Sequence, residues 1–424
     1  MTAVPNTIST LDGLFKVVYG SGPVNVIPEV AIVQKKVKFQ QAERIGKSYN
    51  FPVILTNEAG VTYLAAGAGV STLNDAIAAT LKEASVDANQ IVIRGQMDYE
   101  AAAKAVASKE AFKNASELLV ENLMETGAKR LEIAFLYGRS TTGIGTADSS
   151  ANVNSTTTNV TMLAAGWAPG IWAGIEGAKV NFYRTDTDAL VSSSTDAVFT
   201  VGVVNFSTRV IKFEGTATGI TALDIALAAS DCYIHFQDAK SREPYGLQKI
   251  MTNTGSLFGI DAAVYSLWTG STFSFGSAAA TTAKLLNMAG MAVSKGGLME
   301  EADILMSPKT YMNIAGTMTD LRRQGGSDKD GIAGFETITL MGPNGKLNLV
   351  PHPMIKEGEC MLVPFKRVKR IGSQEFSFET PGRKGELFLH IPDKSGYELR
   401  LYGAQAIIVQ QPAKCVYGNA ITNT

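Results

Sequence analysis

Residues 98–138 read DYEAAAKAVASKEAFKNASELLVENLMETGAKRLEIAFLYG, a run of good helix formers that closes on an apolar segment. Asp98 is a residue type that caps helix N-termini, and Gly127 is a type that ends helices. We therefore predict a helix over 99–124, which would be about 40 Å long at 1.5 Å per residue. A helix of this length crosses much of the width of a domain.

The apolar residues of this helix do not keep to one face. At 100° per residue, the first apolar positions share one side of the helix and the later ones lie on nearly the opposite side. The two sets are Tyr99, Ala102, Ala103 and Val106, and then Phe112, Ala115, Leu118, Leu119 and Leu123. Either the helix breaks near Ser108, or its two halves pack against different partners.

The sequence before this helix indicates an arm and a hairpin. Residues 1–46 have no sustained hydrophobic period, which is typical of an extended arm. Residues 48–56 and 89–94 are rich in β-formers, and between them lies an Ala/Gly-rich segment in which we expect a short helix near 73–83. Two strands that leave and return in this way predict a long protruding hairpin over 47–97.

The chain directly after the helix predicts a linker and a small β module. Residues 139–160 are dominated by Ser, Thr, Gly and Asn, which is typical of a loop or linker. Beyond them, segments with strand-like alternation predict a β module over about 163–236, so that 139–236 hold a linker and an inserted β domain. The four alternating segments are 178–183, 197–204, 209–213 and 232–236.

The remaining chain predicts a mixed domain and a strand-rich end, so the fold class is α+β. In the mixed α/β domain over 237–370 we expect helices at 282–295 and 309–321 and a strand at 301–308. Pro343-Asn344-Gly345 predicts a hairpin between strands at 338–341 and 346–350. Residues 371–424 are strand-rich, with strands expected at 397–410 and 413–417.

The composition limits the classes of function. The 424 residues include 38 Lys and Arg and 39 Asp and Glu, so the net charge is -1, and only 18% of residues are charged. A balanced charge argues against intrinsic disorder and against a dedicated nucleic-acid binder, which needs a basic surface. A large surface with few charges tends to self-associate, so we expect the chain to bury surface against copies of itself.

No motif identifies catalytic chemistry. Gly46-Lys47-Ser48 lacks the earlier glycine of a phosphate-binding loop, because Gln41 stands in its place. Residues 67–72 lack the third glycine of a dinucleotide-binding fingerprint and are better interpreted as a loop tip. No other spacing isolates a nucleophile or a pair of carboxylates, so we predict no catalytic or cofactor-binding residues and no enzymatic activity.

The histidines and cysteines do not predict a metal site. His235 lies three residues from both Cys232 and Asp238, which in a β-rich region favours a core histidine over a ligand. The three cysteines are too far apart in the sequence for a disulfide framework and predict buried free thiols in a reducing compartment. The residues of both types are His235, His352 and His390, and Cys232, Cys360 and Cys415.

The densest basic run, the N-terminus and the longest apolar stretch add three expectations. As a strand, Lys366-Arg367-Val368-Lys369-Arg370 would carry cations on both faces, and we favour a solvated edge or a subunit contact over a DNA contact. Residues 1–6 lack the basic and apolar regions of a signal peptide, so we expect synthesis in a cytoplasm. Residues 162–175 are too short, and too interrupted by glycine and proline, for a membrane span.

The order of these parts resembles the major capsid proteins of tailed bacteriophages with the HK97-type fold. The resemblance covers most of the chain and depends on the order of segments, because that family has no catalytic motif. The β module departs from the minimal plan of the family, although some of its members carry inserted domains. Segments similar to the family's local patterns are Glu132–Gly138, Ala302–Tyr311 (ADILMSPKTY), Leu349–Gly358 (LVPHPMIKEG) and Leu399–Val409 (LRLYGAQAIIV).

The resemblance implies hexamers and pentamers that close into an icosahedral shell around double-stranded DNA in the virion. It makes 47–97 the E-loop, which lies over a neighbouring subunit, 98–138 the spine helix, and 237–370 much of the axial domain. The implied partners are copies of the chain, together with scaffolding, portal and decoration proteins. Contact with packaged DNA would be weak and independent of sequence, since the chain is nearly neutral.

Two alternatives stay open. An encapsulin-like compartment protein has the same fold, but such shells are usually built from shorter chains without an inserted domain. A β-rich phage tail protein or adhesin would account for the Ser/Thr-rich segment and the β module. It would leave the long helix and the α/β region unexplained.

Overall fold

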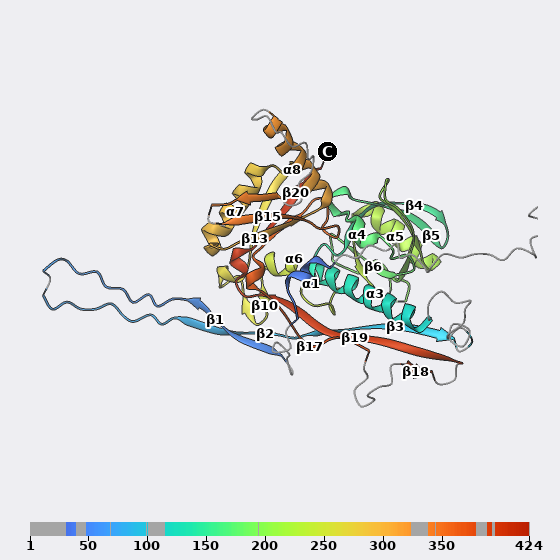
Figure 1. Ribbon diagram of the computed structural model, residues 1–424, viewed down its shortest axis with the longest axis horizontal. Helices are drawn as coiled ribbons and strands as arrows, with labels where there is room; N and C mark the ends of the chain where they lie inside the picture. The colour runs from blue at the N-terminus through green and yellow to red at the C-terminus, as the bar shows by residue number, and fades with distance from the viewer. Residues whose placement is uncertain are drawn as a thin grey trace, which may run out of the picture. The chain divides into compact units, whose positions relative to one another are not determined.

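Figure 1 shows the computed structural model, which describes residues 31–39, 48–67, 69–98, 100, 115–193, 195–323, 338–343, 345–378, 388–391 and 395–423. Contacts divide these residues into a smaller unit, drawn from 93–126 and 378–401, and a larger unit that holds the others. Most of the predicted arm, and residues 101–114 of the predicted long helix, lie outside the described residues.

A six-stranded mixed sheet forms one part of the larger unit. Every residue of its strand β13 is buried, because β13 lies inside the sheet, parallel to β15 and antiparallel to β16. The order of strands is β12 (Ser271–Ala278), β20 (Val416–Ile421), β16 (Cys360–Val363), β13 (Ala302–Met306), β15 (Lys346–Pro351) and β14 (Ile338–Met341).

Two helices accompany this sheet, α7 (Thr282–Gly296) and α8 (Pro308–Arg323). The buried residues of α7 recur at the i, i+3, i+4 and i+7 spacing of an amphipathic helix; they are Leu285, Met288, Ala289 and Ala292. The Thr281 hydroxyl caps its start, and Gly297, with φ of 61°, ends it in the left-handed conformation. The predicted helices at 282–295 and 309–321, the strand at 301–308 and the hairpin of β14 and β15 are confirmed.

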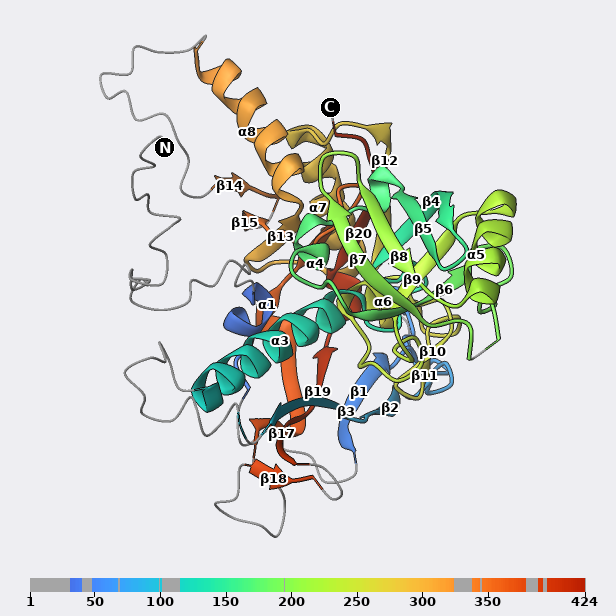
Figure 2. The ribbon, with the colours of Figure 1, turned by 90° about the vertical axis from the view of Figure 1, so that its right-hand side faces the viewer.

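A closed six-stranded barrel forms another part of the larger unit (Figure 2). Three phenylalanines fill its interior: the rings of Phe199 and Phe213 pack edge-on to Phe182, with centroids 5.1 Å and 5.0 Å away. The helix α5 (Ala217–Ala229) lies against β4. The order of strands is β4 (Gly145–Asn154), β5 (Thr157–Met162), β8 (Val210–Glu214), β7 (Phe199–Asn205), β6 (Lys179–Arg184) and β9 (Cys232–Phe236).

The prediction of a linker at 139–160 is wrong, because β4 and β5 are the first two strands of the barrel. β4 is mostly exposed from Asp148 onward, so most of its residues there can be Ser, Ala or Asn. In β5 only alternate positions such as Thr158 and Val160 face the interior. A strand of this kind has the composition of a linker, whereas the four strands predicted further along the barrel are confirmed.

The chain enters and leaves the barrel segment at neighbouring points of the larger unit. The Gly246 N–H donates a hydrogen bond of 2.9 Å to the Gly138 carbonyl, so the two ends of the inserted segment touch. A Cβ atom on Gly138 would lie 2.1 Å from the Pro244 carbonyl oxygen, a distance that no side chain tolerates. Glycine is therefore required where the chain enters the barrel segment.

A hairpin of β1 (Tyr49–Thr56) and β2 (Thr80–Val86) extends from the larger unit (Figure 1). The connection over 57–79 has no regular secondary structure in its described residues. The helix predicted near 73–83 is wrong, since Thr80–Val86 is a strand in which Ala84 and Val86 are buried. Burial of these two residues against the subunit outweighs the helix propensity of the neighbouring Lys82 and Glu83.

The return strand of the hairpin also differs from the prediction. The segment at 89–94 does form a strand, β3 (Asn89–Asp98), but β3 pairs with β19 (Gly396–Val409) rather than with β1. The base of the hairpin instead packs on its own unit through one face. Phe51 lies in two small clusters there, one with Val86 and the other with Ala84 and Trp268.

The helix α3 runs from Ala115 to Tyr137, so the predicted stop at Gly127 is wrong. Gly127 is a buried position inside the helix, where glycine costs about 1 kcal/mol relative to alanine. All residues from Leu131 to Tyr137 are buried, and their packing offsets that cost. The first half of the predicted stripe lies outside the described residues, and in the second half Leu123 is buried.

The smaller unit contains the ends of several elements. β18 (Phe388–His390) pairs with the first residues of β19, and the Arg94 guanidinium donates to Glu398 Oε2 at 2.5 Å. In the larger unit, β17 (Val368–Ser377) pairs with the rest of β19. Short elements complete the described chain: α1 (Ile32–Lys36), η3 (Ala164–Gly166), α4 (Pro169–Trp172), α6 (Leu247–Met251), β10 (Ser256–Leu257), β11 (Ile260–Asp261), η4 (Ser266–Trp268), η5 (Phe365–Arg367) and η6 (Pro412–Lys414).

None of the helices in the described ranges is long and apolar enough to cross a membrane.

We expect Phe213→Ala to lower the free energy of unfolding by about 3–5 kcal/mol, because it leaves a cavity among the barrel phenylalanines. Urea titration followed by tryptophan fluorescence measures the change. Val203→Ala, on the same barrel, is the matched control, since that side chain is 70% exposed. Equal effects of the two substitutions would contradict the packing of Phe213 inside the barrel.

Candidate functional site

The three cysteines and His235, which the sequence singled out, are buried. All three cysteines are buried and free, as predicted, and burial raises the pKa of Cys232 to about 11 and that of Cys415 to about 12. His235 is a buried residue of β9, and burial, with Lys240 and Lys356 nearby, lowers its pKa to about 3. No group of three or more His, Cys, Asp or Glu residues in the described part of the chain could hold a metal ion.

The structure describes the glycine motifs only in part and the basic run in full. Gly46-Lys47 lies outside the described residues, and 67–72 lie in the hairpin connection. The basic run is not one strand, because η5 ends at Arg367 and β17 begins at Val368. Arg370 is buried, with its Nε 2.5 Å from Gln405 Oε1. The side chain of His390 is not described.

A buried carboxylate, Glu132 of α3, organises the first polar cluster. Glu132 and His352 are both fully buried, and His352 Nε2 lies 3.0 Å from Glu132 Oε1. The Met354 N–H donates to the other ring nitrogen, Nδ1, at 3.2 Å. Because Nδ1 accepts a hydrogen bond, the ring carries its proton on Nε2 and donates it to Glu132.

The same carboxylate holds the segment that contains α1. The Val33 N–H donates to Glu132 Oε1 at 2.5 Å, and the Gln34 N–H donates to Oε2 at 3.1 Å. The Gln34 side-chain amide donates to Oε2 at 3.1 Å and to the Ala128 carbonyl at 2.7 Å. The Glu132 cluster (Val33, Gln34, Glu132 and His352) therefore joins three parts of the chain that are far apart in sequence.

A second polar cluster lies where the barrel meets the six-stranded sheet. Lys356 is fully buried, and its Nζ donates to Thr142 Oγ1 at 2.9 Å and lies 3.7 Å from Glu359 Oε1. Burial lowers the pKa of Lys356, and the negative charge of Glu359 opposes that effect. The Gln248 amide bridges Thr142 and the Tyr417 hydroxyl, both at 3.0 Å. These contacts position α6, β20 and the start of the barrel segment together.

An exposed apolar surface lies on the hairpin. Eight apolar side chains of β1, β2 and their connection are each more than half exposed: Ile54, Val61, Tyr63, Leu64, Val70, Leu73, Ile77 and Leu81. Residues 48–81 contain two carboxylates, Glu58 and Asp75, and no Lys or Arg. Exposed apolar surface of this extent is typical of an interaction site.

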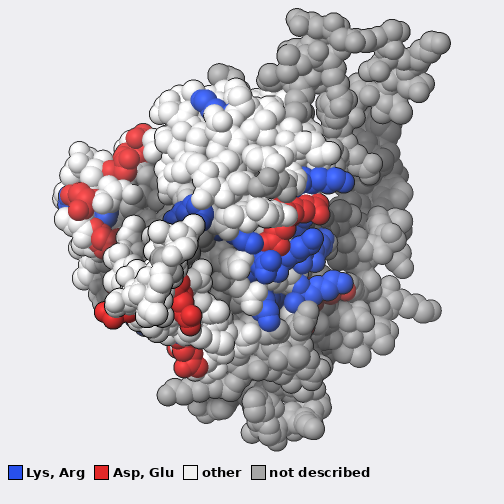
Figure 3. Space-filling view, turned by 90° about the vertical axis from the view of Figure 1, so that its left-hand side faces the viewer, with Lys and Arg blue, Asp and Glu red and all other residues white. Residues whose placement is uncertain are grey.

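The opposite kind of surface, rich in charges, is visible in Figure 3, where blue and red side chains lie side by side on one face. Glu300 accepts from Arg367 at 2.8 Å and from Lys414 at 3.1 Å. Lys36 pairs with Asp303 and also lies 5.4 Å from the centre of the Phe365 ring. Arg367, Lys414 and Lys36 are therefore partly neutralised within the subunit, while Lys366 is exposed.

Three solved structures are similar to the chain over nearly its whole length. The capsid asymmetric unit of cyanophage A-1(L) has 12% sequence identity and a TM-score of 0.58, with 99% of this chain and 100% of that chain covered. The capsids of native and empty GTA particles each have 10% identity and the same coverage, with TM-scores of 0.52 and 0.50. At these identities the likeness shows the fold, and the fold class predicted from sequence is confirmed.

A scan against protein-family profiles finds no match to the chain, and a search of curated proteins finds none.

We expect Glu132→Gln to release the segment around α1, because the amide nitrogen cannot accept the hydrogen bonds that the carboxylate accepts. Trypsin should then cleave after Lys35, Lys36 and Lys38 about tenfold faster, as expected for the loss of charge-assisted hydrogen bonds. Mass spectrometry of the products over time measures the rate. Glu176→Gln, at an exposed carboxylate, is the control. An unchanged cleavage rate in Glu132→Gln would rule out this role of the Glu132 cluster.

We expect the barrel to lose stability in acid through His235. The folded pKa of His235, about 3, lies below its ordinary value of 6.5, so its contribution is fully present above pH 6.5 and is lost as the pH falls toward 3. One such group changes the free energy of unfolding by at most about 1.4 kcal/mol per pH unit. Urea midpoints between pH 4 and pH 8 should therefore have a shallower slope in His235→Gln, and identical slopes would contradict the assignment.

Proposed function

We propose that this chain, which has the HK97-type capsid fold, is the major capsid protein of a tailed bacteriophage. In this proposal it assembles into the hexamers and pentamers of an icosahedral shell that encloses double-stranded DNA. The supporting observation is the β1–β2 hairpin, which presents eight exposed apolar side chains and packs on its own subunit at its base. A subunit that functions alone has no use for such a surface.

The hairpin acts as the E-loop, and its apolar face lies on a neighbouring subunit. Burying one large apolar side chain contributes about 1.5–3 kcal/mol, so several together stabilise a contact between subunits. The anchoring at the base supports this role. Ala84 and Val86 fasten the hairpin to its own subunit, and the connection over 57–79 is left free to reach outward.

The domain limits predicted from sequence give each further part a role in this proposal. Residues 1–46 form the arm, 98–138 the spine helix with its peripheral segment, and 237–370 the axial domain. Residues 371–424 return strands to the peripheral and axial core, and the β domain within 139–236 braces neighbouring subunits. The chain carries out no catalysis, since its clusters of polar side chains join parts of the subunit.

The partners and the localisation of the protein follow from the same proposal. The subunit is made and assembled in the host cytoplasm and ends in the virion, with copies of itself as its main partner. Scaffolding, portal and decoration proteins are further partners. Contact with the packaged DNA is weak and independent of sequence, because the net charge is only -1 and Glu300 and Asp303 pair with Arg367, Lys414 and Lys36.

An encapsulin-like compartment protein is the second candidate, because it would have the same fold and the same need for subunit contacts. The six-stranded barrel favours the phage shell, since the compartment proteins are usually built without an inserted domain. The gene neighbourhood separates the two, with portal and terminase genes expected here. The hypothesis of a β-rich tail protein or adhesin does not account for the α/β sheet and the long helix.

We expect the triple variant Val61→Ser, Leu64→Ser and Leu73→Ser to fold but to form few or no particles, because it removes apolar contact area from the E-loop alone. Negative-stain electron microscopy and light scattering of the protein, expressed with its scaffold where one is needed, measure assembly. Circular dichroism checks the fold. Deleting residues 58–78 should have the same result, and this deletion keeps the packed strand β2.

The matched control is Val61→Ile, Leu64→Met and Leu73→Met, which changes the same positions and keeps them apolar. It should assemble as the parent chain does. Normal particles from the serine variant and from the deletion would overturn the E-loop assignment. A parent chain that stays monomeric under all these conditions would overturn the proposed function itself.

A further inference from the structure

Two surfaces of the larger unit differ in charge, and the barrel provides the acidic one. Residues 145–236 contain four Lys and Arg and eight Asp and Glu. None of the four cations lies in 145–178 or 213–236, the ranges that contain β4, β5, α5 and β9. The side of the barrel formed by β4 and by α5, which lies against β4, is therefore acidic.

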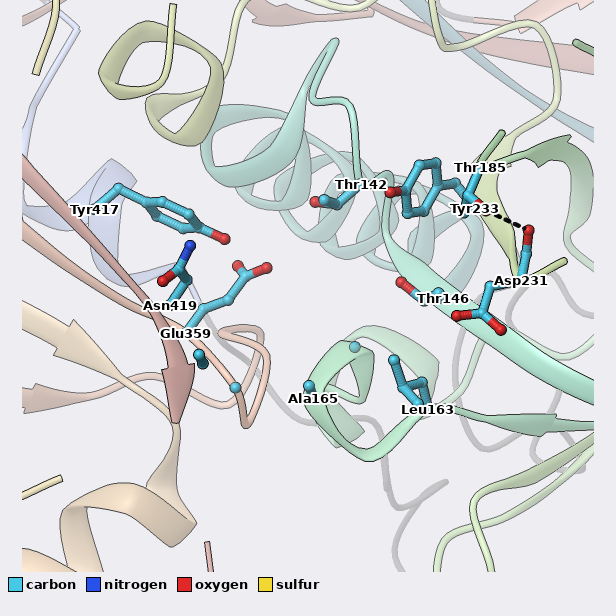
Figure 4. A pocket seen from close by; sticks show the side chains of 13 residues that line it. Thr142, Thr146, Leu163, Ala165, Thr185, Asp231, Tyr233, Glu359, Tyr417 and Asn419 are labelled. Carbon is cyan, nitrogen blue, oxygen red and sulfur yellow. Dashed lines mark hydrogen bonds between the residues drawn. The ribbon is translucent and has the colours of Figure 1, made fainter. Parts of the chain in front are cut away.

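Three carboxylates make up this acidic flank: Asp148, Asp224 and Asp231. Asp224 accepts hydrogen bonds from two neutral donors, Asn152 Nδ2 at 3.0 Å and Thr158 Oγ1 at 3.2 Å. Burial and the nearby charge of Asp148 raise the pKa of Asp231, so these two carboxylates lie close together. The Asp231 carbonyl accepts from Thr185 beside a pocket of about 380 Å³ (Figure 4), among whose lining residues there is no Lys or Arg. These contacts leave the negative charge of the acidic flank uncompensated.

The acidic flank also exposes apolar side chains. Ile225 of α5 is 65% exposed, and Val153 of β4 is 55% exposed. The helix packs on the barrel through other residues, including the buried Ile220, Leu223 and Leu227. Exposed apolar side chains that are rimmed by polar residues are typical of an interaction site.

The second surface lies beside the six-stranded sheet and has an excess of positive charge. Arg367 and Lys414 converge on Glu300, and Lys36 lies over the ring of Phe365, the first residue of η5. Figure 3 shows how the Lys and Arg side chains gather there. The basic face consists of five cations and three carboxylates: Lys36, Lys346, Lys366, Arg367 and Lys414, with Glu300, Glu301 and Asp303.

Two exposed methionines belong to the basic face. Met299 is 76% exposed and precedes Glu300 in the chain. Met341 is 75% exposed and pairs with Lys346. A Cβ atom on Gly345 would lie 3.2 Å from the Glu300 carbonyl oxygen, so both methionines lie close to one contact. Methionine side chains are flexible and polarisable, and they adapt to an apolar partner surface.

The two surfaces lie on different sides of the larger unit. In Figure 1 the barrel is at the right and β13, β15 and α7 are at the left, and Figure 3 views the left-hand side. A ring of identical subunits is held together by heterologous contacts, in which a patch meets a different patch of the next copy. Complementary patches on different sides of one subunit fit such a ring.

We propose that the acidic flank of one copy docks on the basic face of the next copy, with the exposed apolar side chains of the two surfaces in contact. This inference rests on the proposed function, because it names the surfaces through which the barrel braces its neighbours. The hairpin of a neighbouring copy cannot neutralise the acidic flank, since residues 48–81 contain two carboxylates and no Lys or Arg. The basic face has the complementary charge.

Cross-linking between introduced cysteines tests the proposal, because the three natural cysteines are buried. In the double variant Ile225→Cys and Met341→Cys, a flexible bis-maleimide added to assembled particles should link subunits into dimers and longer ladders on a denaturing gel. Each single variant should stay monomeric on the gel, since a heterologous contact brings two different patches together. No links in the double variant, or equal links in a single variant, would overturn the proposal.

Charge reversal is the second test. Asp148→Lys and Lys366→Glu should each lower the yield of particles about fivefold or more, and the double variant, which exchanges the two charges, should restore it. Both side chains are exposed, so the variants should fold, as circular dichroism can check. Lys309→Glu, at an exposed lysine beyond the other end of β13, is the control. A double variant that assembles no better than the single variants, or an equal loss in the control, would overturn the proposal.

Failure of this inference differs from failure of the proposed function. If the parent chain and the double-cysteine variant form particles whose subunits do not cross-link, the docking of the acidic flank on the basic face is wrong and the shell function stands. A parent chain that forms no particles overturns both, because no neighbouring copy is then in place.

Discussion

A buried carboxylate must receive several hydrogen bonds. In this chain the hydrogen bonds to Glu132 bring together segments that are far apart in the sequence. The carboxylate lies in α3, and its donors come from the segment of α1, nearly a hundred residues earlier, and from His352, more than two hundred residues later. An unpaired charge at this depth would cost several kcal/mol. These hydrogen bonds therefore join α3, the segment around α1 and the residue after β15.

Much of the α/β region could be predicted from sequence because its elements obey local periods. Leu285, Met288, Ala289 and Ala292 follow the helical spacing of α7, and the continuous apolar residues of β13 reflect burial on both faces. The capping residue of α7, its final glycine and the turn between β14 and β15 add local signals. In these segments the local preference and the tertiary environment agree.

Elsewhere, contacts between distant residues override the local signal. Gly127 would end an isolated helix, but the burial of Leu131–Tyr137 continues α3 through it. Thr80–Val86 has the composition of a helix and is a strand because Ala84 and Val86 are buried against the subunit. The Glu132 cluster has no sequence signature, since Glu132, the segment around α1 and His352 are adjacent only after folding.

The contact between Gly138 and Gly246 has a consequence for how this chain can change. The two ends of the barrel segment meet, so replacing the segment by another domain adds little loop-closure entropy to the remaining subunit. The inserted domain can therefore be replaced at this place, in evolution or by engineering, with a foreign domain whose termini are adjacent. A replacement domain must cover the buried apolar cluster to which Trp167 and Ile171 of the segment, and Met354 and Ile355 outside it, belong.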